Sequence, residues 1–255
     1  MASDSRYQTV TPSLSLRDFI SHYWLSLDNP DTTYVALPDG AVDLVIQVNG
    51  ASVGSWIYGT TTARVDITLA QPCYYLGIRF KAGQSRHFLN ASARELTDRA
   101  EITDGLLQFG LEEVPEYLTD GSLADRLNHL LESHLAKQQP SHHRIDDVIH
   151  WIAINHGRVS VGEAAELFGK SRRQFERVFL ETVGVSAKFF ATVMRFQQAT
   201  ALMTPPFRLP LAAIAAELGY TDQSHMSHEF KRLANVSPAR FMSEGVAFLQ
   251  DRHGH

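Results

Sequence analysis

The 255-residue sequence has little of what marks secreted, membrane-spanning or disulfide-stabilised proteins. It contains a single cysteine, Cys73, which excludes an internal disulfide and a cysteine-based zinc cluster. No stretch approaches the roughly 18 apolar residues of a membrane span. The first ten residues are polar, so we expect no signal peptide. These absences predict a chain that works in the cytoplasm.

Positive charge is also scarce, since 23 Lys and Arg stand against 28 Asp and Glu, which at first argues against a nucleic-acid partner. The charge is unevenly divided, however. Residues 1–140 hold 10 Lys and Arg against 17 Asp and Glu, a net charge of −7, whereas residues 141–255 hold 13 against 11, a net charge of +2. The two parts therefore have different electrostatic partners, and only the second suits a polyanion.

The most informative pattern is an internal repeat whose two copies are offset by 51 residues. The pairs that share this offset are Ala165-Glu166-Leu167 with Ala216-Glu217-Leu218, Phe179 with Phe230, Val185-Ser186 with Val236-Ser237, and Phe190 with Phe241. One offset that holds over several helical turns indicates a duplicated structural unit.

Each copy has the pattern of two short helices joined by a tight turn. In the first copy, Ser160 and Glu163 form a capping box, which predicts a helix that stops at Gly169. Ser171 then caps a second helix, which ends near Gly184. This arrangement is typical of helix-turn-helix units, whose second helix can enter the major groove of DNA.

The second copy repeats the arrangement with Leu211–Leu218 as its first helix, Gly219 as the stop and Asp222 as the next cap. A long helix predicted over Ser186–Met203 joins the two units and would hold them apart.

The outward side chains of the two second helices decide what these helices can bind. They are Arg172, Arg173, Gln174, Glu176 and Arg177 in the first copy, and Gln223, Ser224, His225, Ser227, His228 and Lys231 in the second. Arg and Gln can read base edges, and Lys and Arg neutralise phosphate. The pattern alone fits solvated helix faces about as well, because helix-turn-helix geometry also occurs in proteins that bind no DNA.

Residues from about Arg144 to Met242 resemble the DNA-binding domain of the AraC/XylS family of transcriptional regulators. The segments that carry the resemblance are Ala215-Ala216-Glu217-Leu218-Gly219-Tyr220, Asp222-Gln223-Ser224, Phe230-Lys231-Arg232 and Val236-Ser237-Pro238. The sequence departs from the family pattern at His228, where Arg is usual, at Met226 in place of Phe, at Asn235 in place of Gly, and at Ala187 in place of Pro. His228 cannot make the bidentate contact of an arginine, whereas Asn235 tolerates the left-handed conformation of a helix stop.

The resemblance implies double-stranded DNA as the partner, and RNA polymerase as a further partner if the chain is an activator. The base-reading positions that it implies are Arg173, Glu176, Arg177, Gln223, Ser224, His225 and His228. The positions assigned to phosphate are Lys170, Arg172, Lys188, Lys231 and Arg232.

We expect the N-terminal half to form a β-rich sandwich or barrel with flanking helices. Short apolar or alternating segments are bounded by turn signals: Tyr34–Leu37, Val42–Val48, Ser55–Gly59, Arg64–Leu69 and Cys73–Phe80. The segments LPDGAVDLVI, YYLGIRF and Ala93–Asp98 resemble an N-terminal domain of a subset of the family. This resemblance implies a sensory domain, loosely cupin-like, with a small-molecule effector.

A ligand pocket in this domain could be lined by Trp24, Asp43, Trp56, Tyr58 and Tyr74. The alternative is that the aromatic side chains are core and that Asp43 is an edge-facing or hydrogen-bonded carboxylate. We expect no metal and no cofactor, because the strand region holds only His22 and His87 as histidine ligands.

Helices are predicted over Gln84–Leu89, Glu101–Phe109 and Ser122–Ala136. The last carries Leu123, Leu127 and Leu131 on one face. This apolar face either packs on its own domain or forms a homodimer interface.

The sequence thus predicts an α+β chain of two domains: a regulatory domain over 1–138, a polar linker over 139–143, and an all-α domain over 144–245 with two helix-turn-helix units joined by a long helix. The predicted function is a one-component, sequence-specific DNA-binding regulator and not an enzyme. The alternative is an enzyme or small-molecule carrier whose helical part serves protein contacts only.

Overall fold

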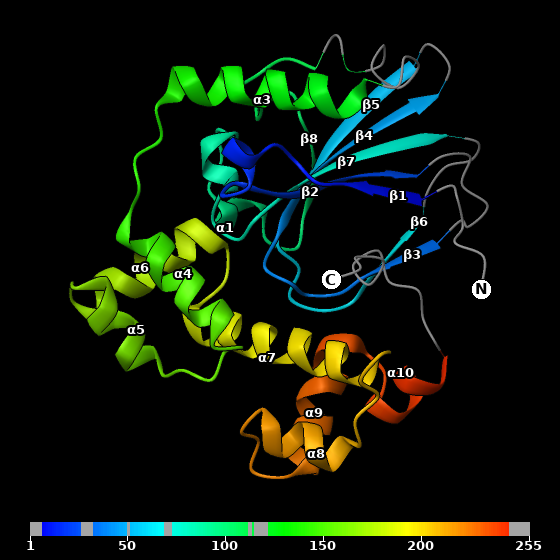
Figure 1. Ribbon diagram of the computed structural model, residues 1–255. Coiled ribbons are helices and arrows are strands. Elements are labelled where there is room, and N and C mark those ends of the chain that lie inside the picture. The colour runs from blue at the N-terminus through cyan, green and yellow to red at the C-terminus, as the bar shows by residue number, and fades with distance from the viewer. Residues whose placement is uncertain are drawn as a thin grey trace.

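The computed structural model describes residues 7–26, 33–49, 52–68, 73–111, 114 and 122–244. The chain forms a β-rich N-terminal part and a helical C-terminal part, which lie against each other (Figure 1). The predicted α+β fold with two domains is confirmed. The outermost residues of the predicted domains, 1–6 and 245, lie outside the described residues.

The N-terminal part is built on a six-stranded sheet in which every pair of neighbours is antiparallel. In spatial order its strands are β1 Tyr7–Val10, β2 Ile20–Ser26, β7 Tyr74–Phe80, β4 Val42–Asn49, β5 Ser52–Tyr58 and β8 Ala100–Ile102. Within the described ranges, two further strands, β3 Thr33–Ala36 and β6 Val65–Thr68, pair only with each other. These strands and the adjoining residues Leu37 and Arg64 are called the ribbon below.

Alternation along β4 shows how the sheet divides its two faces. Val42, Leu44 and Ile46 are buried in the main core of the domain, whereas Asp43 and Val45 point to the opposite face. The core face is covered by α3, Leu123–Gln138, and by the 3-10 helix Leu14–Leu16.

The predicted dimer interface on α3 is wrong for the residues proposed. Leu123, Leu127 and Leu131 are 9%, 0% and 0% exposed, because they pack into the core of their own domain. The outward face of α3 carries exposed polar side chains, among them Asp125 and His129. The helix therefore stabilises the N-terminal domain, and these leucines are not available for an interface with a second copy of the chain.

Two other helix predictions need correction. The residues predicted as a helix over Glu101–Phe109 begin in β8, which pairs with β5, and continue as turns. The helix predicted over Gln84–Leu89 is only a 3-10 turn at Ser85–His87. A one-turn α-helix, α1 Ala93–Leu96, follows it with a complete capping box. In both cases long-range strand pairing and packing override a helical local pattern.

The C-terminal part is entirely helical. Its elements are α4 Arg144–Ile154, α5 Val161–Phe168, α6 Arg172–Val183, α7 Ala187–Met203, α8 Leu211–Glu217, α9 Gln223–Ala234 and α10 Pro238–Glu244. One buried cluster unites α4, α5, α6 and the start of α7, and a second unites the rest of α7 with α8, α9 and α10. Helix α7 thus joins two compact units, as predicted. Among the described helices, none combines the length and apolarity needed to cross a bilayer.

Candidate nucleic-acid interface and ligand cavity

The first helix-turn-helix unit begins and ends its helices at the predicted residues. Ser160 and Glu163 form the capping box of α5, which ends at Gly169 with φ +71°. The Ser171 hydroxyl accepts a hydrogen bond from the Gln174 amide at 3.3 Å, so that α6 starts immediately after the turn. Phe175 and Phe179 anchor α6 in the core, which leaves its opposite face to solvent.

The second unit has the same design, with an additional polar brace. The His225 amide donates to Asp222 Oδ1 at 2.7 Å, and α9 ends at Asn235 with φ +57°, as predicted for a left-handed stop. The Tyr220 hydroxyl donates to Glu229 Oε1 at 2.6 Å, and Arg195 of α7 lies 3.5 Å from the same carboxylate. This brace fixes α9 on α7.

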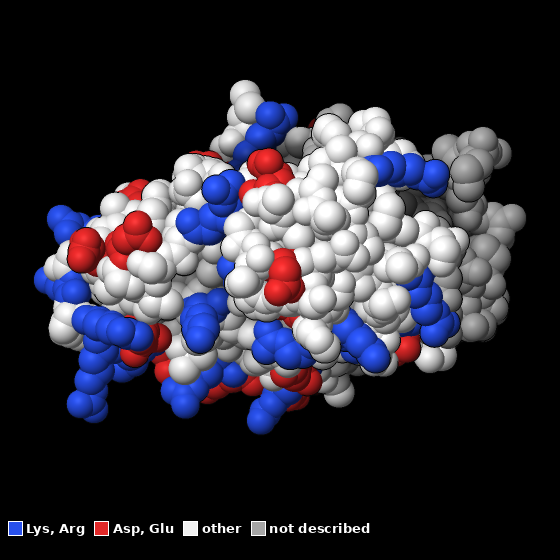
Figure 2. Space-filling view, turned by 90° about the horizontal axis from the view of Figure 1, so that it is seen from below, with Lys and Arg blue, Asp and Glu red and all other residues white. Residues whose placement is uncertain are grey.

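All side chains predicted to read bases or bind phosphate belong to exposed residues: Lys170, Arg172, Arg173, Glu176, Arg177, Lys188, Gln223, Ser224, His225, His228, Lys231 and Arg232. Seen from the side of the helical domain, Lys and Arg side chains line one edge of the molecule, with Asp and Glu among them (Figure 2). Some of the predicted residues also contact one another or a neighbour: Arg172 pairs with Glu176 at 2.9 Å, and Arg232 lies over the ring of Phe189.

The N-terminal domain contacts the C-terminal end of α6. Thr60 Oγ1 donates to the carbonyl of Val183 at 3.0 Å, and Thr97 Oγ1 donates to that of Gly184 at 2.8 Å. These contacts satisfy carbonyls that a helix end would otherwise leave without a partner. The arginines of α6, Arg172, Arg173 and Arg177, stay exposed.

The ribbon contacts the C-terminal end of α9 in a comparable way. The Arg64 amide donates to the carbonyl of Leu233 at 2.8 Å. Val35 and Leu37 are buried in the cluster formed by α7, α8, α9 and α10. Helices α6 and α9 are therefore both held at their C-terminal ends by the N-terminal domain.

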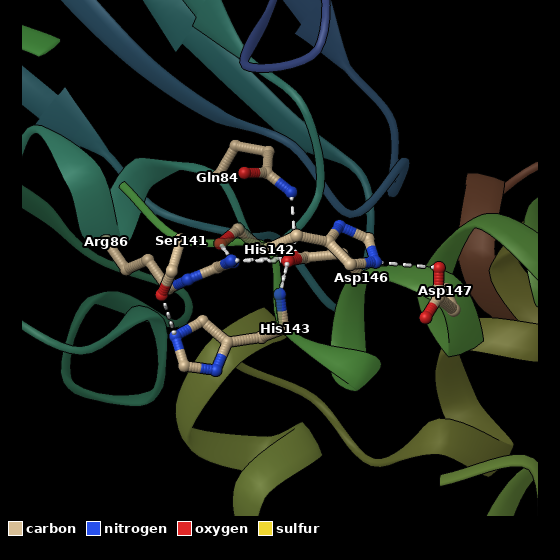
Figure 3. Close-up of polar contacts among 8 residues, drawn as sticks. Gln84, Arg86, Ser141, His142, His143, Asp146 and Asp147 are labelled. Carbon is tan, nitrogen blue, oxygen red and sulfur yellow. Dashed lines mark hydrogen bonds and ion pairs between the residues drawn. The ribbon is translucent and has the colours of Figure 1, made fainter. Parts of the chain in front are cut away.

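A polar cluster at the start of α4 completes the domain interface (Figure 3). Arg86 Nη2 lies 2.7 and 2.9 Å from the two carboxylate oxygens of Asp146, and Gln84 Nε2 donates to the same carboxylate at 3.0 Å. Burial alone would raise the pKa of Asp146. The Arg86 guanidinium and the hydrogen bonds from Arg86, Gln84 and the His143 amide outweigh it, and the pKa lies below its usual value.

A cavity of about 90 Å³ lies between the ribbon and the face of the sheet that carries Asp43. Of the predicted pocket residues, Trp24, Asp43 and Tyr58 line it, while Trp56 and Tyr74 do not. The indole of Trp56 lies over Gly54. Tyr74 begins β7, and its residue is 48% exposed.

The ionisable residues His22, Asp39 and Arg79 also line this cavity, and they were not among the predicted pocket residues. Arg79 pairs with both Asp39 and Asp43, and the distance from its Nη1 to Asp43 Oδ2 is 2.7 Å. Asp39 belongs to the turn signal after Tyr34–Leu37, and Arg79 lies at an alternate position of β7. The charge of Arg79 within an otherwise apolar strand segment was the available signal.

A cleft of about 820 Å³ lies between the two domains. Asp39, Ala41 and Arg79 line both this cleft and the cavity. Across the described ranges, no group of three or more His, Cys, Asp or Glu side chains is placed to hold a metal ion.

Comparison with known proteins supports the two-domain reading. Residues 164–244 match the model of a helix-turn-helix domain, and residues 8–101 match a domain family of unknown function, DUF6597. An uncharacterized HTH-type transcriptional regulator of Haemophilus influenzae is 35% identical over 81 residues, which are 32% of this chain and 27% of that protein. The chain therefore matches about a quarter of the length of that relative.

Solved structures to which the chain is similar include the DNA-binding domain of AdpA in complex with a target DNA. It is 22% identical and covers 40% of this chain and 93% of that one, with a TM-score of 0.38. The structure of ToxT from Vibrio cholerae is 10% identical and covers 93% of this chain and 98% of that one, with a TM-score of 0.48. Taken with the duplicated units and the signature in the second copy, the matches show a helix-turn-helix domain over residues 164–244 that resembles those of AraC/XylS regulators, preceded by a domain of the DUF6597 family.

Proposed function

We propose that the chain regulates transcription in the cytoplasm by binding double-stranded DNA through the N-terminal halves of α6 and α9. One observation carries this proposal: both helices expose a polar N-terminal half while their C-terminal ends are docked on the other domain. The N-terminal residues of a recognition helix are those that contact base edges. Helix α7, with 17 residues, spans roughly 26 Å between the units, on the scale of the ~34 Å between successive major grooves.

The two helices are expected to contribute unequally to base reading. In α6, Arg173 and Arg177 can each bond guanine through two donors, and Glu176 accepts from cytosine or positions Arg172. In α9 the candidates are Gln223, Ser224, His225 and His228, which bond singly or, for histidine, best when protonated. The phosphate contacts fall to Lys170, Arg172, Lys188, Lys231 and Arg232 around them.

A binding-site selection followed by fluorescence anisotropy over a range of salt concentrations tests the proposal. Arg177→Ala should weaken specific binding by at least ~1 kcal/mol and relax selectivity at one or two base pairs. Lys137→Ala, which removes a positive charge at the exposed end of α3, is the matched control and should leave binding unchanged. Equal effects of the two substitutions, or selection of no common sequence, would rule out base reading by α6.

The N-terminal domain is proposed to control DNA binding through a small ligand in the cavity. The ribbon supports this, because successive residues over 34–37 face either the cavity or the second helix-turn-helix unit. Tyr34 and Ala36 line the cavity, whereas Val35 is buried against the second helix-turn-helix unit and Leu37 contributes to both. A ligand that displaces the ribbon must therefore also shift the contact that holds the end of α9.

Leu37→Ala tests this coupling, since it removes a side chain that is 3% exposed in both the cavity wall and the docking contact. The variant should change the affinity for DNA without altering the base preference of the selected site. An activating role would add RNA polymerase as a protein partner. Any homodimer would have to use a surface other than the buried leucines of α3.

A further inference from the structure

The second helix-turn-helix unit contains a polar brace that the sequence of the first unit cannot form. The brace consists of Tyr220 from the turn between α8 and α9, Glu229 of α9 and Arg195 of α7. At the repeat offset of 51 residues, Tyr220 and Glu229 correspond to Gly169 and Val178, whose side chains offer no polar atom. The duplication therefore does not account for the brace, whose contacts belong to the second unit alone.

The hydrogen bond between Tyr220 and Glu229 lies in a place that water hardly reaches. The Glu229 side chain is 11% exposed, and Tyr220 as a whole residue is 8% exposed. Burial and, after it, the hydrogen bond to Glu229 raise the pKa of Tyr220, so that the hydroxyl keeps its proton and donates to the carboxylate at 2.6 Å. Hydrogen bonds to an ionised acceptor are stronger than those between neutral groups.

Arg195 connects this pair to α7. Its Nη2 lies 3.5 Å from Glu229 Oε2, and its guanidinium carbon lies over the Tyr220 ring, 5.1 Å from the ring centroid. Within the part of the chain that the structure describes, the buried Arg195 Nε has no hydrogen-bond partner. The carboxylate and the face of the ring therefore compensate the guanidinium, and the guanidinium in turn packs on one face of Tyr220.

The Tyr220 ring also contacts His225, which is a candidate for base reading. The two ring centroids lie 5.4 Å apart, and the planes meet at 89° in an edge-to-face arrangement. The His225 amide donates to Asp222 Oδ1 at 2.7 Å, while the residue stays exposed. The backbone and the imidazole of His225 are thus each held by a residue that precedes α9, and the imidazole remains accessible to a ligand.

A side chain that is already held in its bound conformation loses less entropy on binding than one that rotates freely. Resting on the proposed DNA binding through α9, we propose that Tyr220 is a positioning residue for base reading and acts through His225. Its ring holds the imidazole in the conformation that contacts a base edge. Glu229 and Arg195 hold the ring in place.

The test uses the full chain and the DNA site that it selects. The base pairs at which His225→Ala changes the preferred base define the half-site of α9, and those at which Arg177→Ala does so define the half-site of α6. Discrimination in each half-site is the affinity for the selected duplex divided by that for a duplex in which only this half-site is scrambled, as measured by fluorescence anisotropy.

Tyr220→Leu removes the ring and should lower discrimination in the half-site of α9 by about threefold to tenfold, with no change in the half-site of α6. In the His225→Ala background the same substitution should have no further effect, because two residues that act as one unit are not additive. Tyr220→Phe keeps the ring and loses only the bond to Glu229, so it should have a smaller effect in the same half-site, and it serves if Tyr220→Leu does not fold.

Tyr74→Phe is the matched control, since it removes a hydroxyl from a residue that is 48% exposed in the N-terminal domain, and it should change neither half-site. Equal losses in both half-sites, or additive effects of Tyr220→Leu and His225→Ala, would overturn the positioning role. A wild-type chain that selects a site in which His225→Ala changes no base preference would also overturn it and would leave the proposed function standing. A wild-type chain that selects no common sequence would refute the proposed function itself.

Discussion

Removing the Arg86 side chain tests whether the polar cluster at the start of α4 holds the two domains together. Arg86 and Asp146 are 23% and 15% exposed, and both carboxylate oxygens lie within hydrogen-bond distance of one guanidinium nitrogen. Fully exposed pairs contribute about 0.2–1 kcal/mol, whereas breaking a buried pair costs about 3–5 kcal/mol. Since Gln84 and the His143 amide would still bond Asp146, we expect Arg86→Ala to cost about 2 kcal/mol.

The measurement is chemical unfolding of Arg86→Ala, Asp146→Ala and the double variant, which together give the coupling energy of the pair. The same set of variants at Arg172 and Glu176 is the matched control, because this pair lies at a similar separation of 2.9 Å but is 69% and 49% exposed, and it should contribute less than about 0.5 kcal/mol. A coupling energy for Arg86 and Asp146 no larger than that of the control would refute the reasoning from burial. Limited proteolysis supplies a second readout, since loss of the contact should speed cleavage in the predicted linker over 139–143.

The contribution of the Arg86–Asp146 contact to the free energy of unfolding should decrease in acid. The folded-state pKa of Asp146 lies below its unfolded value of about 3.9. Its stabilising contribution is therefore fully present above about pH 4, and it is lost as the pH falls through the folded-state pKa. Unfolding of Asp146→Ala should accordingly approach that of the wild type in acid, and a difference that persists unchanged at pH 2 would contradict this account.

Three further predictions follow from the two domains. His228→Ala should weaken DNA binding less than Arg177→Ala does, as measured by anisotropy, because a histidine cannot make the bidentate contact with guanine that an arginine makes. A fragment over 141–255 should bind DNA more tightly than the full chain at low salt, because it lacks the segment of net charge −7; gel shifts at rising salt should show the difference vanish. Leu127→Ala should lower the free energy of unfolding by about 2–5 kcal/mol without changing the sedimentation coefficient of the folded chain, since this side chain is buried in its own domain.

The sequence by itself determined the helical domain in detail. The repeat offset, the caps at Ser160, Ser171 and Asp222 and the stops at Gly169 and Asn235 all appear where they were predicted. Caps and stops act over a few residues, so the local sequence contains all the information that they need. The exposed polar face of each recognition helix follows from the same short-range periodicity.

Only the tertiary structure decided which surfaces of the N-terminal domain are buried. The leucines of α3 have the same periodicity whether they pack inward or against another chain, and the sheet that covers them is assembled from strands far away in the sequence. The helix predicted over Glu101–Phe109 failed for the same reason, because pairing of β8 with β5 overrides local preference.

The cavity and the docking of the domains also depend on long-range contacts. Asp39, Asp43 and Arg79 come from three segments that only the sheet and the turn before β4 bring together. The ribbon meets α9 through residues separated by more than 150 positions, as in the hydrogen bond from Arg64 to Leu233. Residue types and local periodicity predicted the two helices that we propose to bind DNA, but the contacts that hold their C-terminal ends arise only when the two domains pack together.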